Sequence, residues 1–177
     1  TAIVTADAGV ANGVGSVLMT ADSDSSSAGD LETTALITGE NITLNGYNIR
    51  TAGALTADRN LSGTGNVTVT AQDNATHNAA VTAGQTAGLI TVTATAGNAT
   101  TGAAGSLDAG GDITVTAGTD ITTGDFVDTE NDQVTMTAGH DITINGAVIA
   151  EDDGGDATGN GITITADNNV AINADLT

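Results

Sequence analysis

The sequence predicts an all-β fold, namely a parallel β-solenoid of about eight irregular coils in a single domain that spans residues 1–177. A coil is one turn of the chain around the solenoid axis. Five-residue segments that alternate apolar and polar side chains recur 23, 23, 21 and 28 residues apart, beginning at Val67, Ile90, Ile113, Val134 and Ile162. A shorter motif begins eight residues after the last three of them, at Ile121, Ile142 and Val170. Alternation with period 2 is typical of a strand with one buried face, and a regular spacing is typical of stacked repeats.

The segment 113–117 shows why each repeat forms a strand and a corner. Ile113 and Val115 fall on one face, and the threonines beside them fall on the other. Gly118 permits a positive φ, so we expect a turn there before the next strand begins at Ile121. One coil cannot bury its own apolar face, but coils stacked about 4.8 Å apart enclose a shared interior. The expected interior residues are Ile113, Val115, Val134, Met136, Ile142, Ile144, Ile162 and Ile164, and those expected to face solvent are Thr114, Thr116, Thr135 and Thr163.

Earlier parts of the chain carry weaker copies of the same pattern. One copy begins at Ile3, a clearer one begins at Val17, and a tighter one lies between Leu36 and Leu61. Polar segments interrupt the pattern, and we expect each to project from the solenoid as an insert. These segments are 22–30, 73–78, 125–132 and 151–156.

The composition excludes several classes of partner. The formal charge is −20, with Arg50 and Arg59 as the only basic residues apart from two histidines, so the surface repels phosphate and nucleic acid is not an expected partner. The chain has no cysteine, which removes disulfides and thiolate metal sites. No run approaches the roughly 18 apolar residues of a membrane span, so we expect no membrane insertion. Because the chain starts at Thr1, we expect a processed chain or a piece of a longer one.

The threonines of the repeated segments define a candidate binding face. If the coils stack in register, they form two parallel outward rows. This Thr-x-Thr surface resembles the ice-binding face of several solenoid antifreeze proteins, although threonine is also simply a good strand former. The residues of this candidate face are Thr68, Thr70, Thr91, Thr93, Thr114, Thr116, Thr135, Thr137, Thr163 and Thr165.

The segment 105–124, Gly-Ser-Leu-Asp-Ala-Gly-Gly-Asp-Ile-Thr-Val-Thr-Ala-Gly-Thr-Asp-Ile-Thr-Thr-Gly, resembles the haemagglutinin-type repeats of filamentous haemagglutinin-like exoproteins. The resemblance covers residues 36–61 and 107–176. It implies a right-handed parallel β-helix at the surface of a Gram-negative bacterium, because those proteins are large secreted adhesins exported by an outer-membrane partner. The coils of this chain are longer and more irregular than the usual repeat, and its charge is unusually acidic. The motif specifies an architecture rather than an activity, and it carries over no catalytic residue.

Acidic loops are the candidate metal sites, because carboxylates among glycines offer the oxygen ligands that Ca²⁺ prefers. The candidate calcium ligands are Asp152, Asp153 and Asp156, with further acidic groups at Asp22, Asp24 and Asp30 and at Asp125, Asp128 and Asp132. Solvated loops without an ion are the alternative interpretation, since none of these groups matches a known calcium loop. His77 and His140 lack a neighbouring ligand at metal-binding spacing, so we expect both to be surface residues and no other cofactor.

We expect no enzymatic activity. Asp152 and Asp153 are adjacent, so on a strand they would point to opposite faces, and a glycine-rich loop would hold neither in place for glycoside hydrolysis.

Five Asn-x-Ser/Thr sequons begin at Asn41, Asn60, Asn66, Asn74 and Asn98. Because asparagine side chains bond the backbone at corners, we expect a structural role for these residues rather than glycosylation.

The sequence therefore predicts a structural and adhesive extracellular protein, such as a surface stalk, a biofilm matrix fibre or a filament subunit. Its expected partners are further copies of itself, stacked head to tail through the terminal coils, and glycans or proteins on host or neighbouring cells. Terminal coils expose unpaired backbone groups and apolar side chains, and no lysine or proline protects their edges. The alternatives are an ice-binding solenoid and a calcium-dependent surface-layer protein.

Overall fold

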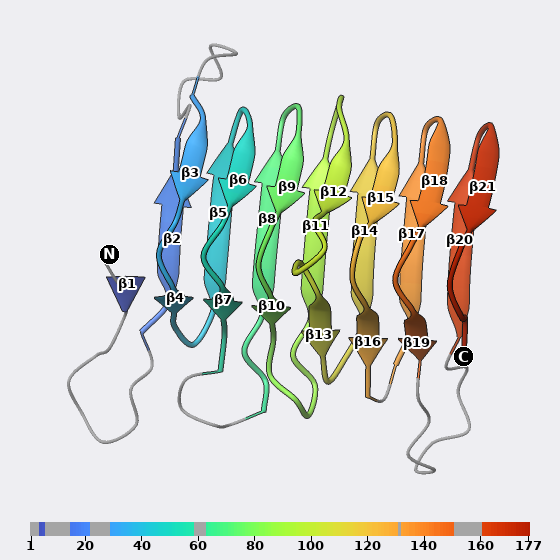
Figure 1. Cartoon of the computed structure of the whole chain (residues 1–177). Coiled ribbons are helices and arrows are strands. Elements are labelled where there is room, and N and C mark those ends of the chain that lie inside the picture. Colours follow the sequence, from blue (N-terminus) through green and yellow to red (C-terminus); the bar gives the residue numbers. More distant parts are fainter. Residues whose placement is uncertain (1–3, 6–14, 22–28, 59–62, 131, 151–160) are drawn as a thin grey trace.

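The computed structural model describes residues 4–5, 15–21, 29–58, 63–130, 132–150 and 161–177. All the regular structure in these residues is β, arranged as three parallel sheets of seven strands each. The chain winds from β1, β2 and β3 at one end to β20 and β21 at the other, and equivalent strands lie side by side along one axis (Figure 1). The predicted parallel β-solenoid is therefore confirmed.

The three sheets are named here A, B and C. Sheet A pairs β1 (Val4–Thr5), β4 (Ile37–Thr38), β7 (Leu55–Thr56), β10 (Val81–Thr82), β13 (Leu107–Ala109), β16 (Val127–Thr129) and β19 (Val148–Ala150). Sheet B pairs β2 (Val17–Thr20), β5 (Ile42–Gly46), β8 (Val67–Ala71), β11 (Ile90–Ala94), β14 (Ile113–Ala117), β17 (Val134–Ala138) and β20 (Ile162–Ala166). Sheet C pairs β3 (Leu31–Thr33), β6 (Ile49–Thr51), β9 (Ala75–His77), β12 (Ala99–Thr101), β15 (Ile121–Thr123), β18 (Asp141–Ile144) and β21 (Asn169–Ile172).

The alternating segments form the strands of sheet B, as the pattern predicts. Each of these strands pairs with the next without a shift, so that Ile90 faces Ile113 and Val92 faces Val115. Six of the eight residues expected in the interior are at most 4% exposed, namely Ile113, Val115, Val134, Met136, Ile142 and Ile144. Ile162 and Ile164 are only half-buried, because β20 has a paired neighbour on one side alone. On the outer face, Thr116 and Thr163 are exposed, whereas Thr114 and Thr135 are half-buried.

The sequence pattern misses sheet A as a distinct element. Its strands are two or three residues long, which is too short for an alternating pattern to stand out from the surrounding loops. Their first residues nevertheless form an apolar inner row that is buried in the core: Ile37, Leu55, Val81, Leu107, Val127 and Val148. In the described residues each sheet has seven strands, so the expectation of about eight coils is slightly too high.

For two of the polar segments, the prediction of a projecting insert is wrong. The segment 73–78 contains strand β9 and the segment 125–132 contains strand β16, so each runs along the body of the solenoid instead of projecting from it. Polar composition is misleading here because only alternate residues of each strand point inward. Residues 22–28 of the first insert and all of 151–156 lie outside the described residues.

Gly118 is required for a different reason from the one expected. The glycine with a positive φ among the described residues is Gly63, at 79°. A Cβ atom on Gly118 would lie 2.4 Å from the carbonyl oxygen of Thr95, which belongs to the preceding coil. Glycine at this corner therefore permits a close approach of two backbones rather than a left-handed conformation.

Candidate functional site

The threonine face of sheet B has the register that the sequence predicts. One row runs through Thr68, Thr91, Thr114, Thr135 and Thr163, and the second runs through Thr70, Thr93, Thr116, Thr137 and Thr165. The first row is mostly half-buried, and the second is mostly exposed. Both rows follow the solenoid axis at the strand spacing of about 4.8 Å, so the face is a regular two-dimensional array of hydroxyl and methyl groups.

Toward the N-terminal end of sheet B, residues other than threonine enter the two rows. Asn45 pairs with Thr70, so the exposed row continues with an amide on β5. The half-buried row continues through Thr43 to Leu18, whose side chain is 69% exposed. The regular Thr-x-Thr array is therefore confined to the five strands from β8 to β20.

The acidic residues named as calcium ligands are not brought together in the part of the chain that can be described. Asp152, Asp153 and Asp156 lie outside that part, as do Asp22 and Asp24. Asp30 accepts a hydrogen bond of 2.8 Å from the side-chain nitrogen of Asn48. Asp125, Asp128 and Asp132 do not form a group of three close ligand atoms.

A different group of possible metal ligands lies at the corner between sheets B and C. His140 Nδ1 is 3.1 Å from Asp120 Oδ1 and 3.0 Å from Asp141 Oδ2, and the three ligand atoms lie within 4.8 Å of one another. One imidazole and two carboxylates suit a transition metal better than Ca²⁺, which prefers oxygen ligands. Sequence spacing alone does not indicate this group, because its members come from two successive coils and His140 has no second ligand at metal-binding spacing.

Hydrogen bonds to Asp141 favour its ionised form. Desolvation raises the pKa of Asp141, but the side chains of Asn169 and Asn168, the backbone N–H of Asn169 and the charge of His140 together lower the pKa below its ordinary value of 3.8. Each of these nitrogen donors lies 2.9 Å from Asp141 Oδ1. The Asp120–His140–Asp141 group is therefore already satisfied by contacts with protein partners.

The same corner carries a continuous ladder of Asn and Asp side chains. In each step the side-chain oxygen of one rung accepts the backbone N–H of the rung on the next coil, at 2.9 to 3.2 Å. The rungs are Asn48, Asn74, Asn98, Asp120, Asp141 and Asn169. A shorter ladder precedes sheet B, where Asn41 Oδ1 accepts from Asn66 N and Asn66 Oδ1 accepts from Leu89 N.

The ladders explain four of the five sequons. Asn41, Asn66, Asn74 and Asn98 each use the side-chain oxygen to bond the next coil, which is the structural role expected for them. Asn60 lies outside the described residues. The sequence does contain a signal for the longer ladder, because an Asn or Asp stands immediately before the first inward apolar residue of each sheet C strand.

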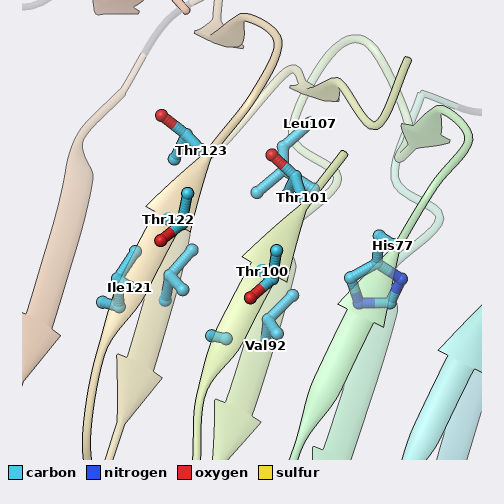
Figure 2. A pocket seen from close by; sticks show the side chains of 10 residues that line it. His77, Val92, Thr100, Thr101, Leu107, Ile121, Thr122 and Thr123 are labelled. Carbon is cyan, nitrogen blue, oxygen red and sulfur yellow. The ribbon is translucent and has the colours of Figure 1, made fainter. Parts of the chain in front are cut away.

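The expectation that His77 is a surface residue is wrong. His77 is 1% exposed, and its Nδ1 lies 2.8 Å from the hydroxyl of Thr51. Burial lowers the pKa of His77 to about 4, so the ring is neutral at neutral pH. The ring lies beside a small cavity of about 10 Å³. Figure 2 shows the ring on β9, with Thr101 and Thr123 following on the next two coils of sheet C. His140 is exposed, as expected.

These features define a solenoid with a regular outer face, ladder-bonded corners and a narrow aliphatic core. No family model, curated protein or solved structure gives a match to this chain. No helix in the described part of the chain is long and apolar enough to cross a membrane.

Proposed function

We propose that the chain is an extracellular structural and adhesive protein that extends by stacking coils end to end. The observation that carries this proposal is the exposure of apolar side chains at the inner positions of the last coil. Val170 and Ile172 pair with the buried Ile142 and Ile144, so they occupy inner positions of sheet C, yet each is 46% exposed. Ile162 and Ile164 are half-buried at the same end of sheet B.

An end of this kind presents a template for a further coil. Its strand edges offer backbone N–H and C=O groups, and its inner side chains would be covered by the inner side chains of the coil placed on it. The added coil belongs either to a longer stretch of the same chain or to a second copy. Repeated addition in one direction generates an open fibre, and the charge of −20 keeps the sides of neighbouring fibres apart.

The finer assignment is to a surface adhesin, matrix fibre or filament subunit of a Gram-negative bacterium, with a right-handed β-helix. The motif at 105–124 supports it by its likeness to haemagglutinin-type repeats. In the structure this motif supplies a buried Leu107, the close corner at Gly110, and strands β14 and β15. Right-handed crossovers between parallel strands of one sheet are also strongly favoured. The partners of such a protein are its own copies and glycans or proteins on other cells.

Light scattering of the purified chain over a range of concentrations tests the end-to-end contact. We expect the mass to rise with concentration, and we expect Ile172→Asp to prevent the rise because it places a charge in the buried contact. The matched control is Ala171→Asp, which adds the same charge at the outer position of the same strand, opposite Thr143. A chain that stays monomeric throughout, or an equal effect of both variants, would contradict stacking between copies.

A second candidate function is ice binding, and the in-register threonine rows of β8, β11, β14, β17 and β20 favour it. A flat array of hydroxyl and methyl groups at a fixed spacing offers a repeating surface to ordered water. Thermal hysteresis and crystal shaping at millimolar protein test this function. Loss of hysteresis in Thr116→Lys, set against Thr122→Lys on sheet C as the control, would support it, and absence of hysteresis in the unmodified chain would exclude it.

A further inference from the structure

The core of the solenoid contains one polar row. At the second inner position of sheet C, successive coils place Thr33, Thr51, His77, Thr101 and Thr123 before the row becomes aliphatic at Ile144. All five polar side chains are at most 8% exposed. His77 is the titratable member of this row, and it replaces a threonine found on the coils at either side.

The imidazole ring of His77 has one hydrogen bond and no compensating charge. Its Nδ1 bonds the Thr51 hydroxyl, while its Nε2 has no hydrogen-bond partner among the described residues. The cavity beside the ring is lined by aliphatic and threonine side chains from the next two coils, with His77 as its titratable member: Val92, Ala99, Thr100, Thr101, Leu107, Val115, Ile121, Thr122 and Thr123 (Figure 2).

The charged groups near His77 all lie on the outside of the solenoid. Four strands pack closely against β9, namely β6, β8, β11 and β12, and Arg50 of β6 is their charged residue. Its side chain is 55% exposed and is paired with Glu32. Asp108 of β13 is at the outer position next to Leu107. No carboxylate therefore reaches the ring from the described strands that surround it.

We propose that His77 makes the coil of β8, β9 and β10 an acid-sensitive joint of the solenoid. Uptake of a proton places a charge and a second N–H donor in a buried interior whose polar groups are threonine hydroxyls and which offers no counter-charge, and this loosens β9 from β6 and β12. The coils farther along keep their pairing, because each coil of a solenoid contacts only its neighbours.

The direction of the pH effect follows from the pKa of the ring. Burial lowers the pKa of His77 from 6.5 to about 4, so the unfolded chain binds the proton more tightly than the folded chain. Stability contributed by the neutral ring is complete above pH 6.5, falls as the pH decreases, and is lost below about pH 4.

Urea unfolding of the full chain at pH 7 and pH 4 tests the joint. We expect the unfolding equilibrium constant of the unmodified chain to rise about 100-fold more over this interval than that of His77→Thr, which carries the residue of the neighbouring coils. If His77→Thr does not fold, His77→Gln gives the same comparison. His140→Thr, which removes the exposed histidine, is the matched control and should retain the additional loss of stability in acid that His77→Thr removes. Equal pH dependence with and without His77 would overturn the proposal.

Hydrogen exchange then tests whether the opening is local. After correction for the intrinsic effect of pH, protection at pH 4 should fall first in β6, β9 and β12 and persist in β17 and β18. His77→Thr should abolish this difference. A uniform loss of protection along the solenoid, or a local loss that His77→Thr leaves unchanged, would overturn the proposal.

Discussion

The side-chain oxygen of Asn74 accepts a hydrogen bond of 2.9 Å from the backbone N–H of Asn98 on the next coil. The same contact recurs from Asn48 to Asn169 and holds one corner of the solenoid in register. Corners lack the strand-to-strand bonds of the sheets, so these side chains satisfy backbone donors that would otherwise lack a protein partner.

We predict that Asn74→Ala lowers the free energy of unfolding by about 0.5 to 1.5 kcal/mol, because the exposed hydrogen bond from the N–H of Asn98 to the Asn74 side chain is lost. Urea denaturation measures the change. Thr76→Ala, at an outer position two residues away on β9, is the control and should cost less than about 0.5 kcal/mol. Equal costs for the two variants would show that the ladder adds nothing beyond ordinary packing.

Val115→Asp should destabilise the fold by roughly 3 kcal/mol or more, because the carboxylate would enter a core one coil wide between Val92 and Met136. Thr116→Asp places the same charge on the exposed face and should be tolerated. Circular dichroism and thermal unfolding distinguish the two. A stable, unchanged Val115→Asp would contradict the observed register.

Salt should stabilise this protein. The net charge of −20 creates self-repulsion in the folded chain, and raising the ionic strength from 0.01 M to 1 M shortens the screening length from about 30 Å to about 3 Å. The midpoint of thermal unfolding is therefore expected to rise by several degrees with sodium chloride. A midpoint that is constant or falls over this range would mean that the acidic groups are already neutralised within the fold.

The Asp141 carboxylate should contribute stability that acid removes. Its pKa in the folded chain is lowered, so this contribution is present above the ordinary value of 3.8 and disappears as the pH falls through the folded value. Asp141→Asn retains an acceptor for Asn169 but does not titrate. The stability difference between the two proteins should shrink below pH 4, and a difference that is constant with pH would refute this role for the charge.

The strands of sheet B were predictable because five alternating residues give a clear period. Ile142 and Ile144 of sheet C were predictable for the same reason. Leu55 and Thr56 of sheet A form a strand only because the coils on either side pair with them, and two residues cannot show a period. Local sequence therefore specifies the long strands, and the stacking of coils specifies the short ones.

The candidate site was less predictable than the fold. The threonine rows follow from a regular register, but the Asp120–His140 contact joins residues 20 apart in sequence through a coil whose length varies. The polar segment around His77 predicts a surface residue, whereas the histidine is buried because it occupies the second inner position of β9. The sequence signal for this burial is that His77 occupies the position that Thr51 and Thr101 occupy in the neighbouring repeats.

Electron microscopy combined with fibre diffraction of the concentrated full chain tests the proposed end-to-end assembly most directly. The proposal predicts unbranched fibres one solenoid wide, with a reflection at about 4.8 Å along the fibre axis from coils that continue across each contact. Separate particles of single-chain length at the same concentration, with no such axial repeat, would contradict it.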